Sequence, residues 1–384
     1  MCASKPSRRK DSCILAAGIM INAHTKSLHD SGQRIWLDNI TRKLLSNGTL
    51  AKYIAELSVT GLTSNPAIFE QAIGSSTDYD VAIQKCASLG ESDEGIFFEL
   101  AIDDLTRAAD LFRPVFDASD GVDGWVSLEV SPLLANDTVN TIKAATALHS
   151  RAARPNLFIK IPGTPEGIAA IEQSIFEGTP INVTLLFSRE HYVAAAEAYL
   201  RGIERRITVG LDPNIASVAS LFVSRWDTAV KEKTAPQFHN RLGIAIAMRT
   251  YGAYCDLLSS ARWQKLTVAG ARPQRLLWAS TGAKDPAAPD TLYIEALAAP
   301  NTINTIPEKT LLAFAEHGKV GAALPTNGGF ADAVLEEFRR EGIDDEALAT
   351  QLQRDGVEAF AKSWRGLMSR ISQKRPASTT TPRG

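Results

Sequence analysis

The chain has 384 residues, of which 45% are hydrophobic and 22% are charged. This is ordinary composition for a globular protein and provides enough material for one large domain or two small ones. The 41 Lys and Arg residues nearly balance the 43 Asp and Glu residues, giving a formal net charge of -2. Because there is no basic surplus, the sequence gives no support for binding to the phosphate backbone of a nucleic acid.

The cysteines and histidines form no pattern that predicts a metal site or a disulfide framework. The six histidines include no His-x-His or His-Glu-x-x-His motif. The four cysteines lack Cys-x-x-Cys spacing and lie far apart, at Cys2, Cys13, Cys86 and Cys255. We therefore expect no metal and no cofactor, and the scattered cysteines favour a reducing, cytoplasmic location.

The chain begins with residues 1–31, which we expect to form a disordered leader. An apolar run of about eight residues, Ile14 to Ile21, follows a basic stretch at residues 8–10. Roughly 20 apolar residues are needed to span a membrane, so no membrane association is predicted. A signal peptide has a similar order of basic and apolar residues, but no small-residue cleavage site follows here. The alternatives to a signal peptide are an unstructured leader, or a sequence start placed too early, ahead of a true initiator at Met20.

Downstream, short apolar runs alternate with longer segments of helical periodicity. This alternation predicts an α/β fold built on a parallel sheet. The predicted strands are residues 34–37, 59–63, 125–129, 158–161, 181–186, 216–223, 276–280 and 302–305. The predicted helices between and after them are residues 93–112, 135–153, 166–177, 188–205, 238–260 and 308–317.

Two further helical segments, residues 331–340 and 344–372, follow the last predicted strand. Apolar residues such as Phe360 recur in the second segment at helical spacing, and we interpret both segments as packing elements. The remaining tail, residues 373–384, is rich in Ser, Thr and Pro and is predicted to be disordered. The folded domain should therefore span residues 32–372.

The number of strands leaves two architectures open, a closed (β/α)8 barrel and an open doubly wound sheet. The positions of polar residues favour the barrel, because these residues lie near the C-terminal ends of many different strands. In a barrel those ends converge on one mouth, whereas an open sheet gathers its ligand groups at a single crevice. We therefore predict a TIM barrel with additional C-terminal helices. The polar residues are Asp38, Asn65, Glu129, Lys160, Asn182, Thr184, Arg225 and Ser280.

Lys160 lies within the apolar run from Leu157 to Pro162. Desolvation disfavours a charged ammonium group in such a setting, and a neutral amine can attack a ketone to form a Schiff base. Asp38 and Glu129 also follow apolar strands, and two carboxylates could divide the proton transfers that Schiff-base chemistry requires. Alternatively, Lys160 could reach solvent or pair with a carboxylate. The two carboxylates could instead form ion pairs or cap helices, and Asp38 could cap the helix expected to start near Thr41.

The uncharged residues Asn65, Asn182 and Thr184 could hold sugar hydroxyls through hydrogen bonds. Asn182 and Thr184 alternate along one strand, so both should point into the barrel, where polar groups need partners. For Asn65, which precedes Pro66, a purely local role in a turn is the alternative.

Arg225 and Lys284 could bind a phosphate group. Arginine offers a bidentate fork, and Lys284 follows the small-residue turn at residues 280–283, where backbone amides could bind the same group. The alternatives are an ion pair of Arg225 with Asp227 or Asp256 and a solvated Lys284.

Several long motifs resemble the transaldolase family, in its longer bacterial and plastid form. The resemblance covers roughly residues 32–372. The motifs, in the family's order, are IWLDNI (35–40), GLTSNPAIFEQAI (61–73), SLEVSPLLANDT (127–138), FIKIPGTPEGIAAI (158–171), INVTLLFS (181–188), SVASLFVSRWDTAV (217–230) and LLWASTGAKDP (276–286).

The resemblance implies a (β/α)8 barrel that transfers a dihydroxyacetone unit in the non-oxidative pentose phosphate pathway. The donors would be sedoheptulose 7-phosphate or fructose 6-phosphate, and the acceptors glyceraldehyde 3-phosphate or erythrose 4-phosphate. Lys160 would be the Schiff-base lysine, Asp38 the acid-base group at the cleaved bond, and Glu129 a carboxylate acting through a water. The family also suggests a homodimer. The substrate-binding residues would be Asn65, Thr63, Asn182, Thr184, Ser220, Arg225, Ser280 and Lys284.

Two positions depart from the family pattern. Ser131 stands where many relatives have aspartate, which should leave the chemistry intact. Gly282 stands where shorter transaldolases carry an arginine two residues after the serine, so the assignment of Lys284 to phosphate is a separate hypothesis.

Three other functions fit parts of the sequence. A fructose 6-phosphate aldolase-like lyase would use the same lysine but release free dihydroxyacetone, although such relatives are much shorter chains. A catalytically inactive barrel scaffold is opposed by the presence of Asp38, Glu129 and Lys160 together. A fusion with a sugar-phosphate isomerase would need a second catalytic domain, for which the tail after Ser372 is too short.

Overall fold

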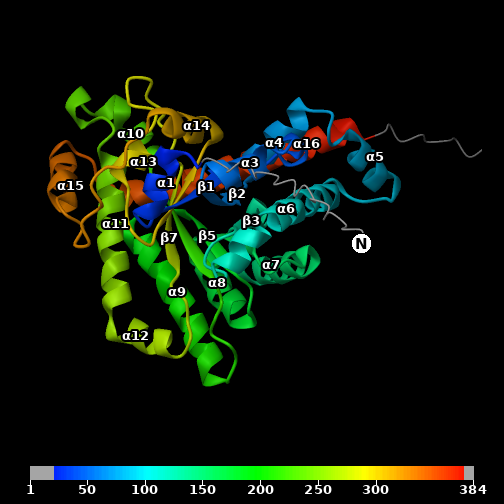
Figure 1. Cartoon of the computed structure of the whole chain (residues 1–384), viewed down its shortest axis with the longest axis horizontal. Coiled ribbons are helices and arrows are strands. Elements are labelled where there is room, and N and C mark those ends of the chain that lie inside the picture. The colour runs from blue at the N-terminus through cyan, green and yellow to red at the C-terminus, as the bar shows by residue number, and fades with distance from the viewer. Residues whose placement is uncertain (1–20, 376–384) are drawn as a thin grey trace, which may run out of the picture.

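A closed barrel of eight parallel strands forms the centre of the molecule (Figure 1). The computed structural model describes residues 21–375. Within them, each strand pairs with the next in chain order, and β8 closes the barrel against β1. The predicted (β/α)8 fold is confirmed, and the open sheet is wrong. The strands are β1 (Arg34–Asp38), β2 (Val59–Thr63), β3 (Trp125–Glu129), β4 (Leu157–Pro162), β5 (Ile181–Leu186), β6 (Ser217–Phe222), β7 (Arg275–Ala279) and β8 (Ile303–Ile306).

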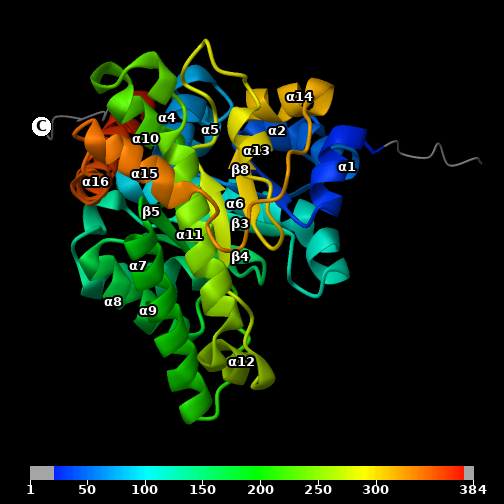
Figure 2. The same ribbon diagram turned by 90° about the vertical axis from the view of Figure 1, so that its left-hand side faces the viewer.

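Helices surround the barrel and cover its outer face. Figure 2 shows α7, α8 and α9, which pack against one another in chain order. The helices up to β6 are α1 (Ala23–Asp30), α2 (Arg42–Ser46), α3 (Thr49–Glu56), α4 (Pro66–Ser75), α5 (Asp80–Ser88), α6 (Asp93–Ala118), α7 (Thr138–Ala152), α8 (Pro165–Glu177) and α9 (Arg189–Thr208). Those after β6 are α10 (Ser224–Val230), α11 (Leu242–Ser259), α12 (Ala261–Val268), α13 (Leu292–Ala296), α14 (Glu308–His317), α15 (Ala331–Arg340) and α16 (Asp345–Lys374). Three 3-10 turns complete the elements of the described residues, at Pro132–Leu134, Lys231–Lys233 and Pro236–Phe238.

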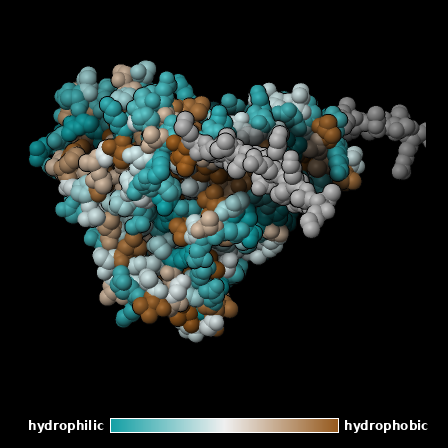
Figure 3. All heavy atoms as spheres, in the orientation of Figure 1, coloured by the Kyte–Doolittle hydropathy of each residue, from teal (hydrophilic) through white to brown (hydrophobic). Residues whose placement is uncertain are grey.

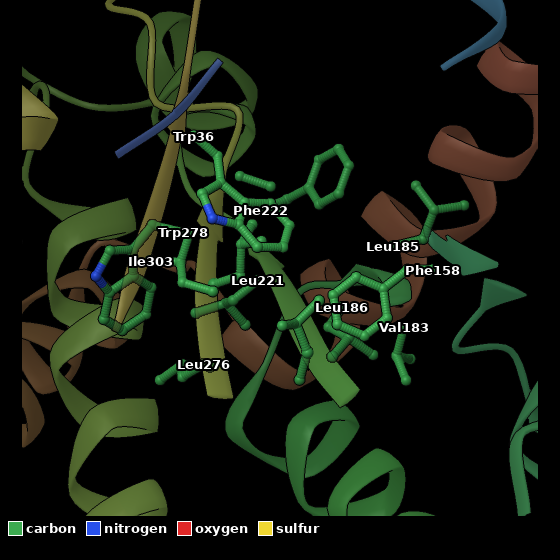
Figure 4. Close-up of a cluster of buried hydrophobic side chains, with 14 of the residues drawn as sticks. Trp36, Phe158, Val183, Leu185, Leu186, Leu221, Phe222, Leu276, Trp278 and Ile303 are labelled. Carbon is green, nitrogen blue, oxygen red and sulfur yellow. The ribbon is translucent and has the colours of Figure 1, made fainter. Parts of the chain in front are cut away.

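Contacts between strands that are not neighbours identify the side chains that fill the barrel interior. The rings of Trp36 on β1 and Phe158 on β4 lie 6.1 Å apart across the barrel. Figure 4 shows these two residues among the buried apolar side chains. Side chains alternate between the two faces of a strand. Asp38 and Lys160, two residues beyond Trp36 and Phe158, therefore also point inward, nearer the C-terminal mouth.

The structure corrects the predicted start of the folded domain. The expectation of a disordered leader is wrong for residues 23–30, which form α1. The Asn22 carboxamide caps this helix and also donates to the carbonyl of Ala315 in α14, while Leu28 is fully buried. The expectation missed α1 because its sequence is mostly polar. The earlier part of the predicted leader, residues 1–20, lies outside the described residues.

The folded domain also ends later than residue 372, the predicted C-terminal boundary. Helix α16 continues to Lys374, whose ammonium group donates to the Ser76 carbonyl and pairs with Asp80. These contacts hold the last turn of α16 against the start of α5, so the predicted tail cannot begin at residue 373. The rest of that tail, residues 376–384, lies outside the described part of the chain.

Hydrophilic side chains spread over much of the face drawn in Figure 3, with apolar residues scattered among them. In the described range, 21–375, no helix combines the length and the apolar character that crossing a membrane requires. The same residues contain no group of three or more His, Cys, Asp or Glu side chains that could hold a metal ion.

Candidate active site

The C-terminal ends of the strands surround a pocket of about 240 Å³. Most of the predicted site residues line it. Two other pockets, of about 350 and 320 Å³, lie near the N-terminal ends of the strands, but no lysine lines either of them. The predicted residues that line the C-terminal pocket are Asp38, Thr63, Asn65, Lys160, Thr184, Ser220, Arg225, Ser280 and Lys284.

Lys160 is buried between β3 and the end of β2. Its Nζ lies 3.2 Å from Oε2 of Glu129 and donates to the backbone carbonyl of Ser64 at 3.3 Å. Lys160 does not reach solvent, since only 5% of the residue is exposed. The alternative interpretation foresaw pairing with a carboxylate, and the partner is one of the two predicted acid-base residues.

Glu129 lies next to Lys160 and is itself buried. Burial raises the pKa of its carboxyl group from 4.5 to about 7, although the nearby Lys160 charge acts in the opposite direction. Its second oxygen, Oε1, has no hydrogen-bond partner within residues 21–375. Glu129 can therefore gain or lose a proton near neutral pH, and Oε1 can bond to a group that reacts at the lysine.

Asp38 is held by a chain of hydroxyl groups across the strand ends. Thr63 Oγ1 donates to Asp38 Oδ1 at 2.8 Å and lies 2.6 Å from Thr305 Oγ1. A hydroxyl carries one proton, so Thr305 donates to Thr63 and Thr63 to Asp38. Burial raises the Asp38 pKa, while Lys160, Thr63 and Lys284 oppose that rise. Asp38 does not cap α2, because Thr41 does. The sequence prediction did not include Thr305 among the site residues.

Asn182 fixes a network beneath the pocket rather than facing the pocket itself. Its Nδ2 donates to Ser127 Oγ on β3, and its Oδ1 accepts from Ser220 Oγ on β6. The bond to Ser127 crosses β4, so these groups lie inside the barrel. Thr184 differs, since its buried Oγ1 has no partner among the described residues and the residue lines the pocket. An unpaired buried hydroxyl is costly, which makes Thr184 the clearest candidate to bond a ligand.

Asn65 has the local role that the sequence left open, and it also lies where it could bind a ligand. Its Oδ1 accepts from the backbone N–H of Ile68 and caps α4, whose first residue is Pro66. The residue also lines the pocket, and its Nδ2 makes no hydrogen bond to any described residue. The cap therefore orients an amide group that can donate to a ligand.

Arg225, the second residue of α10, and Lys284, in the loop after β7, both line the pocket. Among the described residues, neither takes part in an ion pair, so the alternative in which Arg225 pairs with Asp227 or Asp256 is wrong. Asp227 instead accepts hydrogen bonds from Tyr293 and from backbone amides at the start of α11. Ser280 Oγ lies 2.9 Å from Ser224 Oγ. Two cations on one side of the pocket can hold a dianionic phosphate.

The last helix, α16, forms a wall of the pocket that the sequence prediction missed. Ala359, Phe360 and Ser363 line the pocket together with Phe222 of β6. Phe360 was correctly predicted as a helical apolar residue, but its periodicity fits ordinary packing equally well. Only the position of α16 over the mouth shows that one of its turns contributes to the site.

Residues converging from many strand ends on a buried lysine beside a titratable carboxylate define a (β/α)8-barrel enzyme suited to carbonyl chemistry. More specifically, the chain belongs to the transaldolase/fructose-6-phosphate aldolase family, whose sequence profile matches residues 35–371. This confirms the resemblance found in the sequence.

Curated relatives named transaldolase are similar to this chain over nearly its whole length. The protein from Thermobifida fusca (strain YX) is 44% identical over 363 residues, which are 92% of this chain and 99% of that protein. The one from Saccharopolyspora erythraea is 41% identical, covering 92% and 98% of the two chains. The one from Thiobacillus denitrificans is 43% identical, covering 90% and 99%.

Proposed function

We propose that the protein is a transaldolase that carries a dihydroxyacetone unit on Lys160 from a ketose phosphate to an aldose phosphate. The proposed donors are sedoheptulose 7-phosphate and fructose 6-phosphate, and the acceptors are glyceraldehyde 3-phosphate and erythrose 4-phosphate. The observation that carries the proposal is the buried pair of Lys160 Nζ and Glu129 Oε2, 3.2 Å apart. The relatives named transaldolase support the same assignment.

The first step forms the Schiff base. Glu129 takes a proton from Lys160, and the neutral amine attacks C2 of the donor to give a carbinolamine. Glu129 then returns the proton, directly or through a water, to the C2 hydroxyl, which leaves as water. A carboxyl group with a pKa of about 7 can serve as base and then as acid at neutral pH.

The second step breaks the bond between C3 and C4. Asp38 accepts the proton of the C4 hydroxyl as that oxygen becomes an aldehyde, and the bonding electrons move into the iminium to give an enamine. The aldose leaves, and an acceptor aldehyde takes its place. The enamine carbon attacks it while Asp38 returns the proton to the new hydroxyl, after which water releases the product from Lys160. Thr63 and Thr305 hold Asp38 in position for both transfers.

Binding groups at the pocket can keep the sugar phosphate in register. We assign the phosphate to Arg225 and Lys284, with Ser280 beside them, because these charges are not paired with described acidic side chains. Thr184 Oγ1 and Asn65 Nδ2 are assigned to sugar hydroxyls. Asn182 and Ser220 position the neighbouring strands, and their shared network keeps Thr184 facing the ligand.

A fructose 6-phosphate aldolase-like lyase is the second candidate, because the family includes both activities. The relatives named transaldolase match this chain over 90% or more of its length, which supports the transferase. Comparing transfer to erythrose 4-phosphate with release of dihydroxyacetone in its absence separates the two. Release as fast as transfer would contradict our assignment. An inactive scaffold would show neither reaction.

Borohydride reduction in the presence of fructose 6-phosphate tests the lysine directly. The reduced three-carbon adduct should map by mass spectrometry to Lys160 and should be absent in Lys160→Ala. Lys309→Ala is a matched control, since Lys309 is an exposed residue of α14 that does not line the pocket. An adduct on another lysine, or none in the wild-type protein, would overturn the mechanism.

We also propose a cytoplasmic homodimer that binds neither nucleic acid nor membranes. The sugar phosphate substrates, the nearly balanced charge and the scattered cysteines support this proposal. Light scattering coupled to gel filtration should give twice the chain mass of 41.4 kDa. A measured mass equal to that of one chain at micromolar protein concentration would contradict the proposed dimer.

A further inference from the structure

Helix α16 is fixed over the mouth of the barrel at several points along its length. Gln353 Nε2 donates to the carbonyls of Gly163 and Leu185, both at 3.0 Å, at the ends of β4 and β5. One of these carbonyls belongs to Leu185, which has a left-handed φ of 59° and interrupts the register of β5. The strand that carries Thr184 is therefore tied to α16 just beyond that residue.

The middle of α16 also packs closely against the barrel. A Cβ added at Gly356 would lie 3.0 Å from Leu185 Cδ2, so glycine allows a close approach of the helix to β5. One turn beyond Phe360, Trp364 packs edge-on against Phe97 of α6, with ring centroids 5.0 Å apart. These contacts leave α16 little freedom to move away from the pocket.

Phe360 lies between these anchors and faces the lysine. Its ring centroid is 5.6 Å from Lys160 Nζ, and it packs against Phe222 of β6 at 6.5 Å. Only 8% of Phe360 is exposed. Because C2 of any Schiff base on Lys160 is bonded to Nζ and C3 lies one bond further, this apolar ring is close enough to border both reacting carbons.

The enamine intermediate has two possible fates. It can attack an acceptor aldehyde, which completes the transfer. It can instead take a proton from solvent at C3, after which water adds to C2 and the amine leaves, so that free dihydroxyacetone is released. The water consumed balances the water lost when the Schiff base formed, and the net side reaction is cleavage of the ketose into an aldose and dihydroxyacetone.

We propose that Phe360 shields the enamine from protonation by solvent and so sets the ratio of release to transfer. This inference rests on the proposed transaldolase function. In the proposed mechanism, Glu129 and Asp38 each transfer protons at other atoms of the substrate. An apolar ring over the nitrogen excludes ordered water from the side that α16 covers. Phe360 is thereby a specificity-determining residue for the partition between two electrophiles, an aldehyde and a proton.

The experiment compares the rate of dihydroxyacetone release from fructose 6-phosphate alone with the rate of transfer to erythrose 4-phosphate. Phe360→Ala opens the shield and should raise the ratio of release to transfer by about tenfold. Phe360→Leu keeps most of the apolar volume without the aromatic face, so its ratio should stay within about 1.5-fold of wild type. In deuterium oxide, the released dihydroxyacetone should carry one deuterium at C3.

Trp364→Leu is the matched control, because it loosens the same helix without touching the pocket. It should lower the melting temperature but leave the ratio within about twofold of wild type. If Phe360→Ala does not fold, Phe360→Val replaces it, with an expected rise of about threefold.

Three results would overturn the proposal while the wild-type protein still performs transfer. These are an unchanged ratio in the folded Ala or Val variant, an equal rise in Phe360→Leu, or an equal rise in Trp364→Leu. Absence of transfer in the wild-type protein would instead refute the proposed function, so the two failures are distinguishable.

Discussion

Replacing Glu129 by glutamine removes a titrating carboxyl group while keeping its size and shape. Burial raises the Glu129 pKa from 4.5 to about 7. At about 1.4 kcal/mol per pH unit, ionising Glu129 in this site costs about 3 kcal/mol more than in water. Glutamine cannot ionise, so Glu129→Gln abolishes the proton transfer to and from Lys160 without emptying the space beside it.

The pH dependence follows from the proton count of the Glu129 and Lys160 pair. The pair must hold one proton, because with two protons neither a base nor a free amine is present. With a pKa of about 7, the ionised fraction of Glu129 is about one half at pH 7 and about one tenth at pH 6. We therefore expect kcat/KM to fall about fivefold between pH 7 and pH 6 and to change little from pH 8 to pH 9.

The assay is the initial rate of glyceraldehyde 3-phosphate release from fructose 6-phosphate and erythrose 4-phosphate, measured from pH 5.5 to 9. Glu129→Gln should lower kcat/KM at pH 8 by a factor of about 100 to 1000, and its pH profile should no longer show the fall in kcat/KM below pH 7. A wild-type profile that is flat through pH 7 would refute this reasoning. A glutamine variant whose kcat/KM still falls below pH 7 would refute it as well.

Three further substitutions test other parts of the structure. Thr184→Val removes a buried hydroxyl without a partner, so it should raise stability by about 1 kcal/mol in thermal melts yet lower kcat/KM about tenfold. Lys284→Ala should raise KM for fructose 6-phosphate about fivefold with kcat nearly unchanged, while Lys309→Ala leaves both constants alone; an unchanged KM would remove Lys284 from the phosphate site. Leu28→Ala should lower the unfolding free energy by about 3 kcal/mol in urea, and no loss would exclude α1 from the core.

The strands were predictable because each is a short apolar run whose inward residues alternate with outward ones. Residues 59–63, 125–129 and 181–186 were predicted with the same ends that the structure has. The polar residues at the strand ends were also informative, since a polar group that ends an apolar run must be paired or face a ligand. That reasoning brought Asp38, Lys160 and Thr184 into one pocket.

Short helices and long-range contacts were not predictable in the same way. Helices α2 and α13 have five residues each, too few to show a helical period. Thr305 was assigned to a strand, but its hydroxyl contact with Thr63 depends on β8 closing the barrel against β1. The position of Phe360 over Lys160 depends on where α16 packs, which its own sequence does not specify.

The placement of α16 also sets an order of events during synthesis. All eight strands are complete at Ile306, but the helix that covers the pocket begins only at Asp345. The N-terminal part of a chain leaves the ribosome first and is therefore available to fold first. A nascent chain can therefore assemble the barrel and its lysine before α16 is available to cover them. The pocket is covered only when nearly all of the chain through α16 has left the ribosome. A chain truncated before α16 should therefore release more free dihydroxyacetone relative to transfer.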